Sequence, residues 1–286
     1  MIQDMKKLII GAWQGRCVDG DVDANVARAK AAIDEAAKAG CQFLCLPETF
    51  LTGSGTVEEI RKVAIPLTDP RLKALARHAG KRNVVTLVGL AEKRGRRYAV
   101  TQAILAGGKI AGTYVKTMPT GWDWDFSQWY DDNLPVWHFK GLTFGVIVCH
   151  DSSFPEVAAT MAWKGARVIF SPHFNNLPRN RMNDHRLLVR NNHVGIAAHN
   201  NVVVVRANVV GHWERNDAFG YGDSAIFGPN GVPLVEAGLF VEKLITADVA
   251  PYLDGKNSWR DRTELRRPII DELHKAATAA LKRAGK

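Results

Sequence analysis

The chain has 286 residues, of which 46% are hydrophobic, and a formal charge of +9 from 38 basic and 29 acidic residues. This length allows one large α/β domain or two small ones, and the hydrophobic share excludes wholesale disorder. The basic residues are spread along the chain and do not interleave with aromatic side chains, so we expect solubility and attraction of acidic substrates rather than nucleic-acid binding.

The four cysteines, Cys17, Cys41, Cys45 and Cys149, form no CxxC pair and show no metal-ligand spacing. A disulfide framework is not expected in a chain of this size, and we predict neither a metal nor a cofactor. The sequence has no charged-then-apolar leader and no apolar run of about 18 residues. We therefore expect no membrane partner and place the protein in the reducing cytoplasm.

Apolar periodicity predicts strands and helices that alternate along the chain. Strands are expected over residues 8–12, 42–46, 84–90, 98–105, 109–116, 134–139, 142–148, 168–170, 202–207 and 242–249. Helices are expected over residues 25–38, in a stretch that ends at Gly80, after Pro155, and near residues 184–199. Gly40 fits a helix C-cap, and Gly107-Gly108 fits a hairpin turn. This alternation predicts an α/β layered sandwich.

No linker or low-complexity segment interrupts the pattern, so we expect a single domain over residues 1–286 with a C-terminal tail from about residue 256. The tail is predicted to form an amphipathic helix that carries Ile269, Ile270, Leu273 and Leu281.

Residues 117–133 form a stretch of unusual composition, with several aromatic side chains among aspartates. The aromatic residues are Trp122, Trp124, Phe126, Trp129 and Tyr130. So many rings on a loop suggest a pocket wall or an oligomer contact. A loop that folds back onto the core is the alternative.

Cys149 follows the apolar run 146–148, and a polar turn leads from it to Pro155, a residue suited to the first position of a helix. The cysteine is therefore predicted to lie on a sharp corner between a strand and a helix. Such a corner aims the free N–H groups of a helix start at the side chain, which favours a thiolate. The alternative is a buried, inert cysteine at the end of a core strand.

A cysteine nucleophile needs a base and a positive charge where an oxyanion forms. Two other predicted strands end in a charged residue, one at Glu48 and one at Lys116. If these strand ends share one edge of a sheet, they bring Glu48, Lys116 and Cys149 together. Taken singly, a charged residue at a strand end is usually solvated, or a capping residue in the case of a Glu.

Three segments, LPETF (46–50), YVKTMP (114–119) and CHDSSFPE (149–156), resemble the nitrilase superfamily of carbon–nitrogen hydrolases. Three later segments resemble it too: KGARVIFSP (164–172), AHNNVVVVRAN (198–208) and GDSAIFGPNGVPL (222–234). The resemblance implies a four-layer α-β-β-α sandwich. It also implies a homodimer or a higher homo-oligomer in which the helices of two sandwiches meet.

The resemblance further implies a reaction. Cys149 would attack a carbonyl or nitrile carbon to form a thioester or thioimidate, and Glu48 would act as the general base. Lys116 and the backbone N–H of His150 would stabilise the oxyanion. The expected activity is hydrolysis of a small amide through a Cys acyl-enzyme, with release of ammonia or an amine.

The sequence departs from the family pattern in three places. Many members carry a second Glu between the lysine and the cysteine, and none lies between Lys116 and Cys149 here. Asp123 or Asp125 is predicted to take that auxiliary role. In addition, Met118 replaces the usual His, and His199 stands where an acidic residue is often found.

The substrate class is less defined. His150-Asp151 after the nucleophile resembles amidases and carbamoylases, whereas nitrilases tend to have Trp-Glu there. Residues that could hold a substrate carboxylate follow the strand near 168–171, unless this is a solvated basic loop. They are His173, Asn175, Asn176, Arg179 and Arg181.

Trp122 and Trp124 are expected to contact an apolar part of the substrate. An N-carbamoyl amino acid is the alternative substrate to a simple amide, a nitrile is less expected, and a non-catalytic binding protein is the least expected. A zinc hydrolase or deaminase using His150, Asp151, His173 and His185 lacks the HxE and PCxxC pattern.

Overall fold

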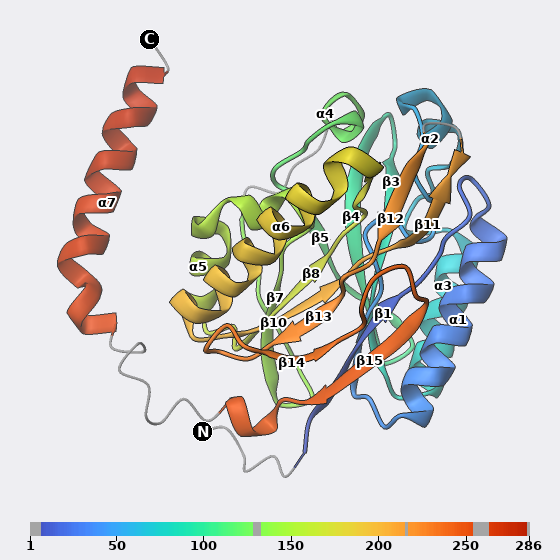
Figure 1. Ribbon diagram of the computed structural model, residues 1–286, viewed down its shortest axis with the longest axis horizontal. Helices are drawn as coiled ribbons and strands as arrows, with labels where there is room; N and C mark the ends of the chain where they lie inside the picture. The colour runs from blue at the N-terminus through green and yellow to red at the C-terminus, as the bar shows by residue number, and fades with distance from the viewer. Residues whose placement is uncertain (1–6, 128–132, 215–216, 254–262, 285–286) are drawn as a thin grey trace.

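Two six-stranded β-sheets form the centre of the computed structural model, which describes residues 7–127, 133–214, 217–253 and 263–284 (Figure 1). The strand orders are β15-β1-β2-β3-β4-β5 and β14-β13-β10-β8-β7-β6. The first sheet consists of β1 (Ile9–Gln14), β2 (Phe43–Cys45), β3 (Val85–Arg94), β4 (Arg97–Ala106), β5 (Lys109–Val115) and β15 (Lys243–Asp248). The second consists of β6 (Trp137–Phe139), β7 (Leu142–Val146), β8 (Val168–Pro172), β10 (Val203–Ala207), β13 (Ala225–Phe227) and β14 (Pro233–Glu236).

Helices cover the outer face of each sheet (Figure 1). The first sheet is covered by α1 (Val22–Lys38) and α3 (Pro70–Lys81), and the second by α5 (Pro155–Trp163) and α6 (Arg179–Asn200). The predicted four-layer α-β-β-α sandwich is therefore confirmed. The shorter helices are α2 (Val57–Val63), α4 (Trp122–Phe126) and the 3-10 turns η1 (Cys149–Ser153) and η3 (Ala250–Tyr252).

The alternation of side chains along β2 explains how the layers pack. Phe43 and Cys45 point into the core between the two sheets, whereas Leu44 points into the core beneath α1 and α3. The ring of Phe43 lies 5.6 Å from that of Phe144 and 6.1 Å from that of Phe170, which both belong to the second sheet. These aromatic contacts fix the two sheets face to face.

Local sequence signals set the ends of the covering helices. The side chain of Asp21 accepts a hydrogen bond from the Ala24 N–H and caps α1, which ends before Gly40 in the left-handed conformation that glycine favours. Pro155 occupies the first turn of α5, as the sequence predicts.

Three strands deliver polar residues to one edge of the sandwich. β2 runs parallel to β3, and two antiparallel pairings bring β5 into the same direction as β3. Glu48 therefore follows β2 at the same edge where Lys116 follows β5. Cys149 follows β7 of the facing sheet. Three residues that are far apart in the sequence are therefore brought to the same edge of the sandwich.

Several boundaries differ from the prediction. β7 ends at Val146, two residues earlier than expected, because Cys149 already begins a 3-10 turn. α6 begins at Arg179, ahead of the expected start near residue 184. A small sheet of order β11-β12-β9 was not predicted; its strands are β11 (Val210–Trp213), β12 (Ala218–Tyr221) and β9 (Asn176–Pro178).

The tail contains α7 (Thr263–Ala284), which Figure 1 shows apart from the sandwich. Its apolar residues Ile269, Leu273 and Leu281 are exposed. The amphipathic helix predicted for the tail is thus present. None of the helices in the described ranges is long and apolar enough to cross a membrane.

Gly89 on β3 allows the segment that carries Glu48 to pack directly on the strand. A Cβ atom there would lie 2.6 Å from the Pro47 carbonyl oxygen and 2.7 Å from the carbonyl carbon of Glu48. We expect Gly89→Ala to lower the free energy of unfolding by about 1–3 kcal/mol and to reduce activity by displacing Glu48. Thermal unfolding and a rate assay would measure both effects.

Gly195 in α6 provides the matched control, since an added Cβ would meet no atom closer than 3.8 Å. Gly195→Ala should leave activity unchanged and raise stability by up to about 1 kcal/mol, because alanine favours a helix. Equal behaviour of the two variants would contradict the close packing at Gly89.

Candidate active site

Cys149 lies at the corner between β7 and α5, in a left-handed backbone conformation with φ 49°. A non-glycine residue rarely adopts this conformation, and such strain is concentrated at functional sites. The conformation turns the side chain away from the strand direction and into a cavity at the sheet edge. The predicted corner is therefore present, formed by a 3-10 turn rather than directly by an α-helix.

Asp151 holds this corner against the end of β5. Its carboxylate is fully buried and accepts hydrogen bonds from the backbone N–H groups of Val148 (2.8 Å), Thr117 (3.2 Å) and Met118 (2.7 Å). The Tyr114 hydroxyl donates a further bond of 2.8 Å. One side chain thus links the cysteine turn to the residues just after Lys116. The sequence associates Asp151 with amidases and with a possible zinc site, but no pattern in it predicts this structural role.

The pKa of Asp151 reflects two opposing influences. Burial raises it to about 6, while the hydrogen bonds from Val148 and Met118 and the positive charge of Lys116 act in the opposite direction.

Lys116 is buried between two carboxylates. Its Nζ donates a hydrogen bond of 2.9 Å to Glu48 Oε1 and another to Asp123 Oδ2. Burial alone would lower the pKa of Lys116, but the charges of Glu48 and Asp123 outweigh it and raise that pKa well above its usual value. The ammonium is therefore charged. Of the two auxiliary candidates, the structure brings Asp123 into the site, whereas Asp125 is exposed.

Glu48 is fixed on both sides of its carboxylate. Oε1 accepts from Lys116, and Oε2 accepts a hydrogen bond of 2.9 Å from the backbone N–H of Phe174. Burial raises the pKa of Glu48, Lys116 lowers it, and the nearby charge of Asp123 raises it again, with a net shift upward. A carboxylate with a raised pKa is a better base than one in water.

The Cys149 thiol is protonated at rest. Burial and the charge of Glu48 raise its pKa to about 12, although Lys116 lowers it. The amide of Asn175 donates a hydrogen bond to Cys149 Sγ across 3.4 Å. A resting thiol of this kind needs a neighbouring base to become a nucleophile.

These groups line a cavity of about 230 Å³. Its lining is completed by Thr120, Gly121, Phe174, Asn175, Asn176, Leu177 and His185. Of these, Thr120, Gly121, Phe174, Leu177 and His185 had no predicted contact with an amide substrate. Leu177 and Asn176 reach the cavity because β9 pairs with β12, a long-range pairing that no local pattern in the sequence signals.

Other predicted substrate contacts lie elsewhere. His173 is fully buried behind the site, where its Nε2 lies 3.1 Å from Nε2 of His193. The ring of His150 packs on Phe154, and the side chain of Trp124 is 67% exposed. Arg179 and Arg181 are exposed as well. Their side chains do not line the cavity as far as the described residues define it.

The predicted aromatic wall is only partly described. Trp122 begins α4, Phe126 is buried, and Trp129 and Tyr130 lie outside the described residues. The ring that lines the cavity is that of Phe174, which packs at 5.3 Å on Trp213. Within the described ranges, no group of three or more His, Cys, Asp or Glu side chains is arranged to hold a metal ion.

The family description of the carbon–nitrogen hydrolases matches residues 9–254, so the chain belongs to that family. The predicted family and enzyme class are therefore confirmed: the protein is a carbon–nitrogen hydrolase.

Individual proteins agree with this assignment. The chain is 31% identical over 262 residues to a protein of Pseudomonas protegens called "Hydrolase in pqqF 5'region", with 89% of this chain and 88% of the relative covered. It is 29% identical over 222 residues to an (R)-stereoselective amidase of a Pseudomonas species, covering 77% of each. An amidase from Nesterenkonia sp. has the same fold, with a TM-score of 0.71, 22% identity, and 91% and 95% of the two chains covered.

The four cysteines should differ sharply in reactivity. Cys17, Cys41 and Cys45 are buried in the core, whereas Cys149 is partly exposed and lines the cavity, so a reagent reaches its sulfur most readily. We expect iodoacetamide to add to Cys149 alone in the folded protein and to all four cysteines after unfolding. Intact-mass spectrometry would count the adducts.

The rate of that labelling should rise with pH. Because the pKa of Cys149 is raised to about 12, the thiolate fraction grows about tenfold for each pH unit below that value. A rate that levels off below about pH 9, or a second adduct on folded protein, would contradict the protonated resting state.

Proposed function

We propose that this enzyme hydrolyses the C–N bond of a small, neutral, linear amide through an acyl-enzyme on Cys149. The observation that carries the proposal is the convergence of Glu48, Lys116, Asp123 and the Cys149 thiol on one cavity of about 230 Å³. This arrangement supplies a nucleophile, a base and a fixed cation within one cavity.

In the first half of the reaction, Glu48 takes the thiol proton as Sγ forms a bond to the amide carbonyl carbon. Negative charge then develops on the carbonyl oxygen, where the Lys116 ammonium and the backbone N–H of His150 stabilise it. The proton on Glu48 passes to the amide nitrogen, the C–N bond breaks, and ammonia or an amine leaves. A thioester on Cys149 remains.

In the second half, Glu48 takes a proton from water while the oxygen of that water attacks the thioester. The oxyanion forms in the same place and is stabilised by the same donors. When the C–S bond breaks, the proton returns to Cys149 Sγ and the carboxylic acid is released. The same base thus serves both halves.

Asp123 takes the place of the second Glu found in many family members. It raises the pKa of Lys116 and holds the ammonium from the side opposite to Glu48. Its shorter side chain reaches Lys116 because α4 begins at Trp122, only six residues after the lysine. Thr120 N–H also donates to Asp123 and fixes its orientation.

The size and charge of the cavity support a small neutral substrate. Pockets that enclose drug-sized molecules measure roughly 300–1,000 Å³. The charged groups of this lining are Glu48, Asp123 and Lys116, so carboxylates outnumber ammonium groups. A substrate carboxylate would meet no free cation on the described lining. A simple amide is therefore favoured over an N-carbamoyl amino acid.

The protein is further proposed to act as a homo-oligomer in the cytoplasm, as one domain with a C-terminal tail. Exposed apolar side chains on the outer helices, Trp163 on α5 with Leu187 and Leu188 on α6, support association through this layer. All four cysteines are free, which suits a reducing compartment. Light scattering of purified protein and cell fractionation test these two points.

A screen for ammonia release tests the activity. Short aliphatic amides should be turned over faster than N-carbamoyl amino acids or nitriles, because they fit the cavity and carry no carboxylate. Cys149→Ala should abolish turnover in folded protein, since loss of a covalent nucleophile commonly costs several orders of magnitude in rate. Activity in that variant above about a tenth of wild type would rule out the acyl-enzyme, and a preference for N-carbamoyl amino acids would overturn the proposed substrate class.

Asp123→Asn and Asp125→Asn form a matched pair. Asp123→Asn should lower kcat on the order of 10- to 100-fold, because the Lys116 ammonium loses one of its two carboxylates where the oxyanion forms. Since Asp123 raises the pKa of Glu48, its removal should also shift the acid limb of kcat/KM to lower pH. Asp125→Asn should match wild type, and equal rates for both variants would refute the auxiliary role.

A further inference from the structure

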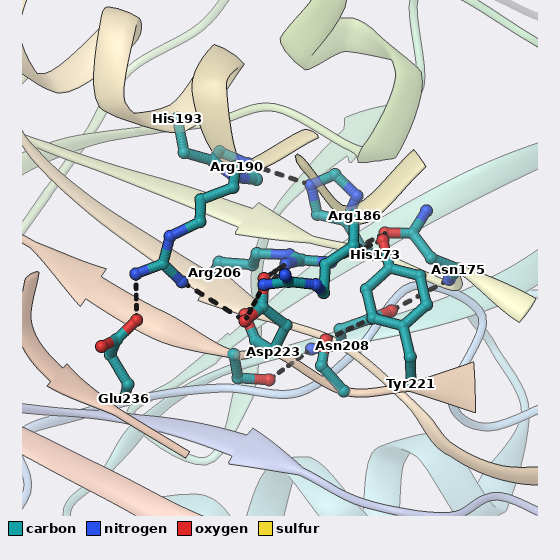
Figure 2. Close-up of polar contacts among 12 residues, drawn as sticks. His173, Asn175, Arg186, Arg190, His193, Arg206, Asn208, Tyr221, Asp223 and Glu236 are labelled. Atoms are coloured by element: carbon teal, nitrogen blue, oxygen red, sulfur yellow. Dashed lines mark hydrogen bonds and ion pairs between the residues drawn. The ribbon is translucent and has the colours of Figure 1, made fainter. Parts of the chain in front are cut away.

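Arg206 is a fully buried charged residue that the reaction described above does not use. It lies on β10 in the segment VVVRA, between β8 and β13, and it is the largest fully buried side chain among the described residues. An unpaired guanidinium in such a place would cost several kcal/mol. Its hydrogen-bond partners therefore indicate why it is tolerated (Figure 2).

One side of the guanidinium is bound to Asp223. Arg206 Nη1 donates to the Asp223 backbone oxygen (2.9 Å) and to Asp223 Oδ2 (3.0 Å). Asp223 is also paired with Arg190 (3.3 Å), and Arg190 continues to Glu236 at the surface (Figure 2). This chain of ion pairs anchors Arg206 from the side away from the cavity.

The other side of the guanidinium reaches the active site. Arg206 Nη2 donates to Asn175 Oδ1 (3.0 Å) and to the Tyr221 hydroxyl (3.1 Å), and that hydroxyl donates to Asn175 Oδ1 (3.3 Å). Two donors thus converge on one amide oxygen. A flipped amide would place its NH₂ group against both donors, so the oxygen must face Arg206. The nitrogen consequently faces Cys149 Sγ, 3.4 Å away.

We propose that Arg206 is a positioning residue that aims the Asn175 amide at Cys149. The backbone of Asn175 is held separately, because its N–H donates to Asn208 Oδ1 (2.9 Å). Only the orientation of the side-chain amide depends on Arg206 and Tyr221. With the amide nitrogen toward the sulfur, its N–H stabilises the thiolate as the thiol proton leaves. This role rests on the proposed function of Cys149 as the nucleophile.

Arg206→Lys tests the proposal because it keeps the positive charge and removes the fork that reaches Asp223 and Asn175 together. We expect kcat to fall on the order of 10- to 100-fold with little change in KM, since a misaligned group costs mainly in the transition state. Iodoacetamide labelling of Cys149 at fixed pH should slow as well. Thermal unfolding would verify that the variant is folded.

Arg190→Lys is the matched control. It makes the same substitution in a residue that also pairs with Asp223 but does not contact Asn175. A purely structural role for the ion-pair chain predicts similar losses in both variants, whereas the positioning role predicts wild-type kcat and labelling for Arg190→Lys. Equal losses would overturn the proposal.

A double-mutant cycle with Asn175→Ala gives the decisive result. If Arg206 acts through Asn175, then Arg206→Lys should cause no further loss of kcat or labelling rate when Asn175 is already alanine. Losses that multiply would show that Arg206 acts independently and would overturn the proposal. If Arg206→Lys does not fold, Tyr221→Phe removes the second donor to the same oxygen, and unchanged labelling in that variant would also overturn it.

The experiments distinguish failure of the proposed amide hydrolysis from failure of the positioning role of Arg206. Labelling of Cys149 needs no substrate, so the Arg206 comparison remains measurable even if the wild-type protein releases ammonia from none of the amides tested. Absence of turnover with intact labelling differences would reject the amide substrate and retain the positioning role.

Discussion

The buried ammonium of Lys116 is the charge on which the active site depends. Glu48 and Asp123 both accept a hydrogen bond from this ammonium, and the cation between them relieves the repulsion of two neighbouring carboxylates. The cation in turn would be too costly to bury without them. The three charged side chains can therefore be buried only side by side. This requirement fixes the relative positions of the segments that carry them.

The surrounding fold meets this requirement through a few buried polar side chains. Asp151 ties the cysteine turn to the residues after Lys116, and the Phe174 N–H ties Glu48 to the segment after β8. Each contact joins segments that are distant in sequence. The site is thus held by buried hydrogen bonds at the ends of rigid strands, where supporting groups position catalytic ones well.

Those long-range contacts also mark the limit of what the sequence predicts. Glu48, Lys116 and Cys149 could be identified because each follows an apolar strand and sits in a specific motif. Arg206 could not, because an arginine within VVVRA gives no sign of its partners in other strands. His173 was expected to face the substrate, but Ser171 near the end of β8 and His173 just beyond it both contact His193 on α6. The sandwich was predictable from alternating elements, whereas β9, β11 and β12 depend on pairings between distant segments.

Two charge clusters of opposite excess lie near Cys149, a buried one around Lys116 and one that runs from the buried Arg206 to Glu236 at the surface. On one side a single lysine meets two carboxylates, and on the other Arg186, Arg190 and Arg206 meet Asp223 and Glu236. Burial and the charge of Glu48 raise the pKa of the Cys149 thiol to about 12, so the thiol stays protonated at rest. In the proposed reaction, negative charge on the sulfur and on the substrate oxygen appears only during attack, when the Asn175 amide and the Lys116 ammonium would stabilise it. Donors that act at that moment lower the barrier without stabilising the resting state, which is the arrangement that increases kcat.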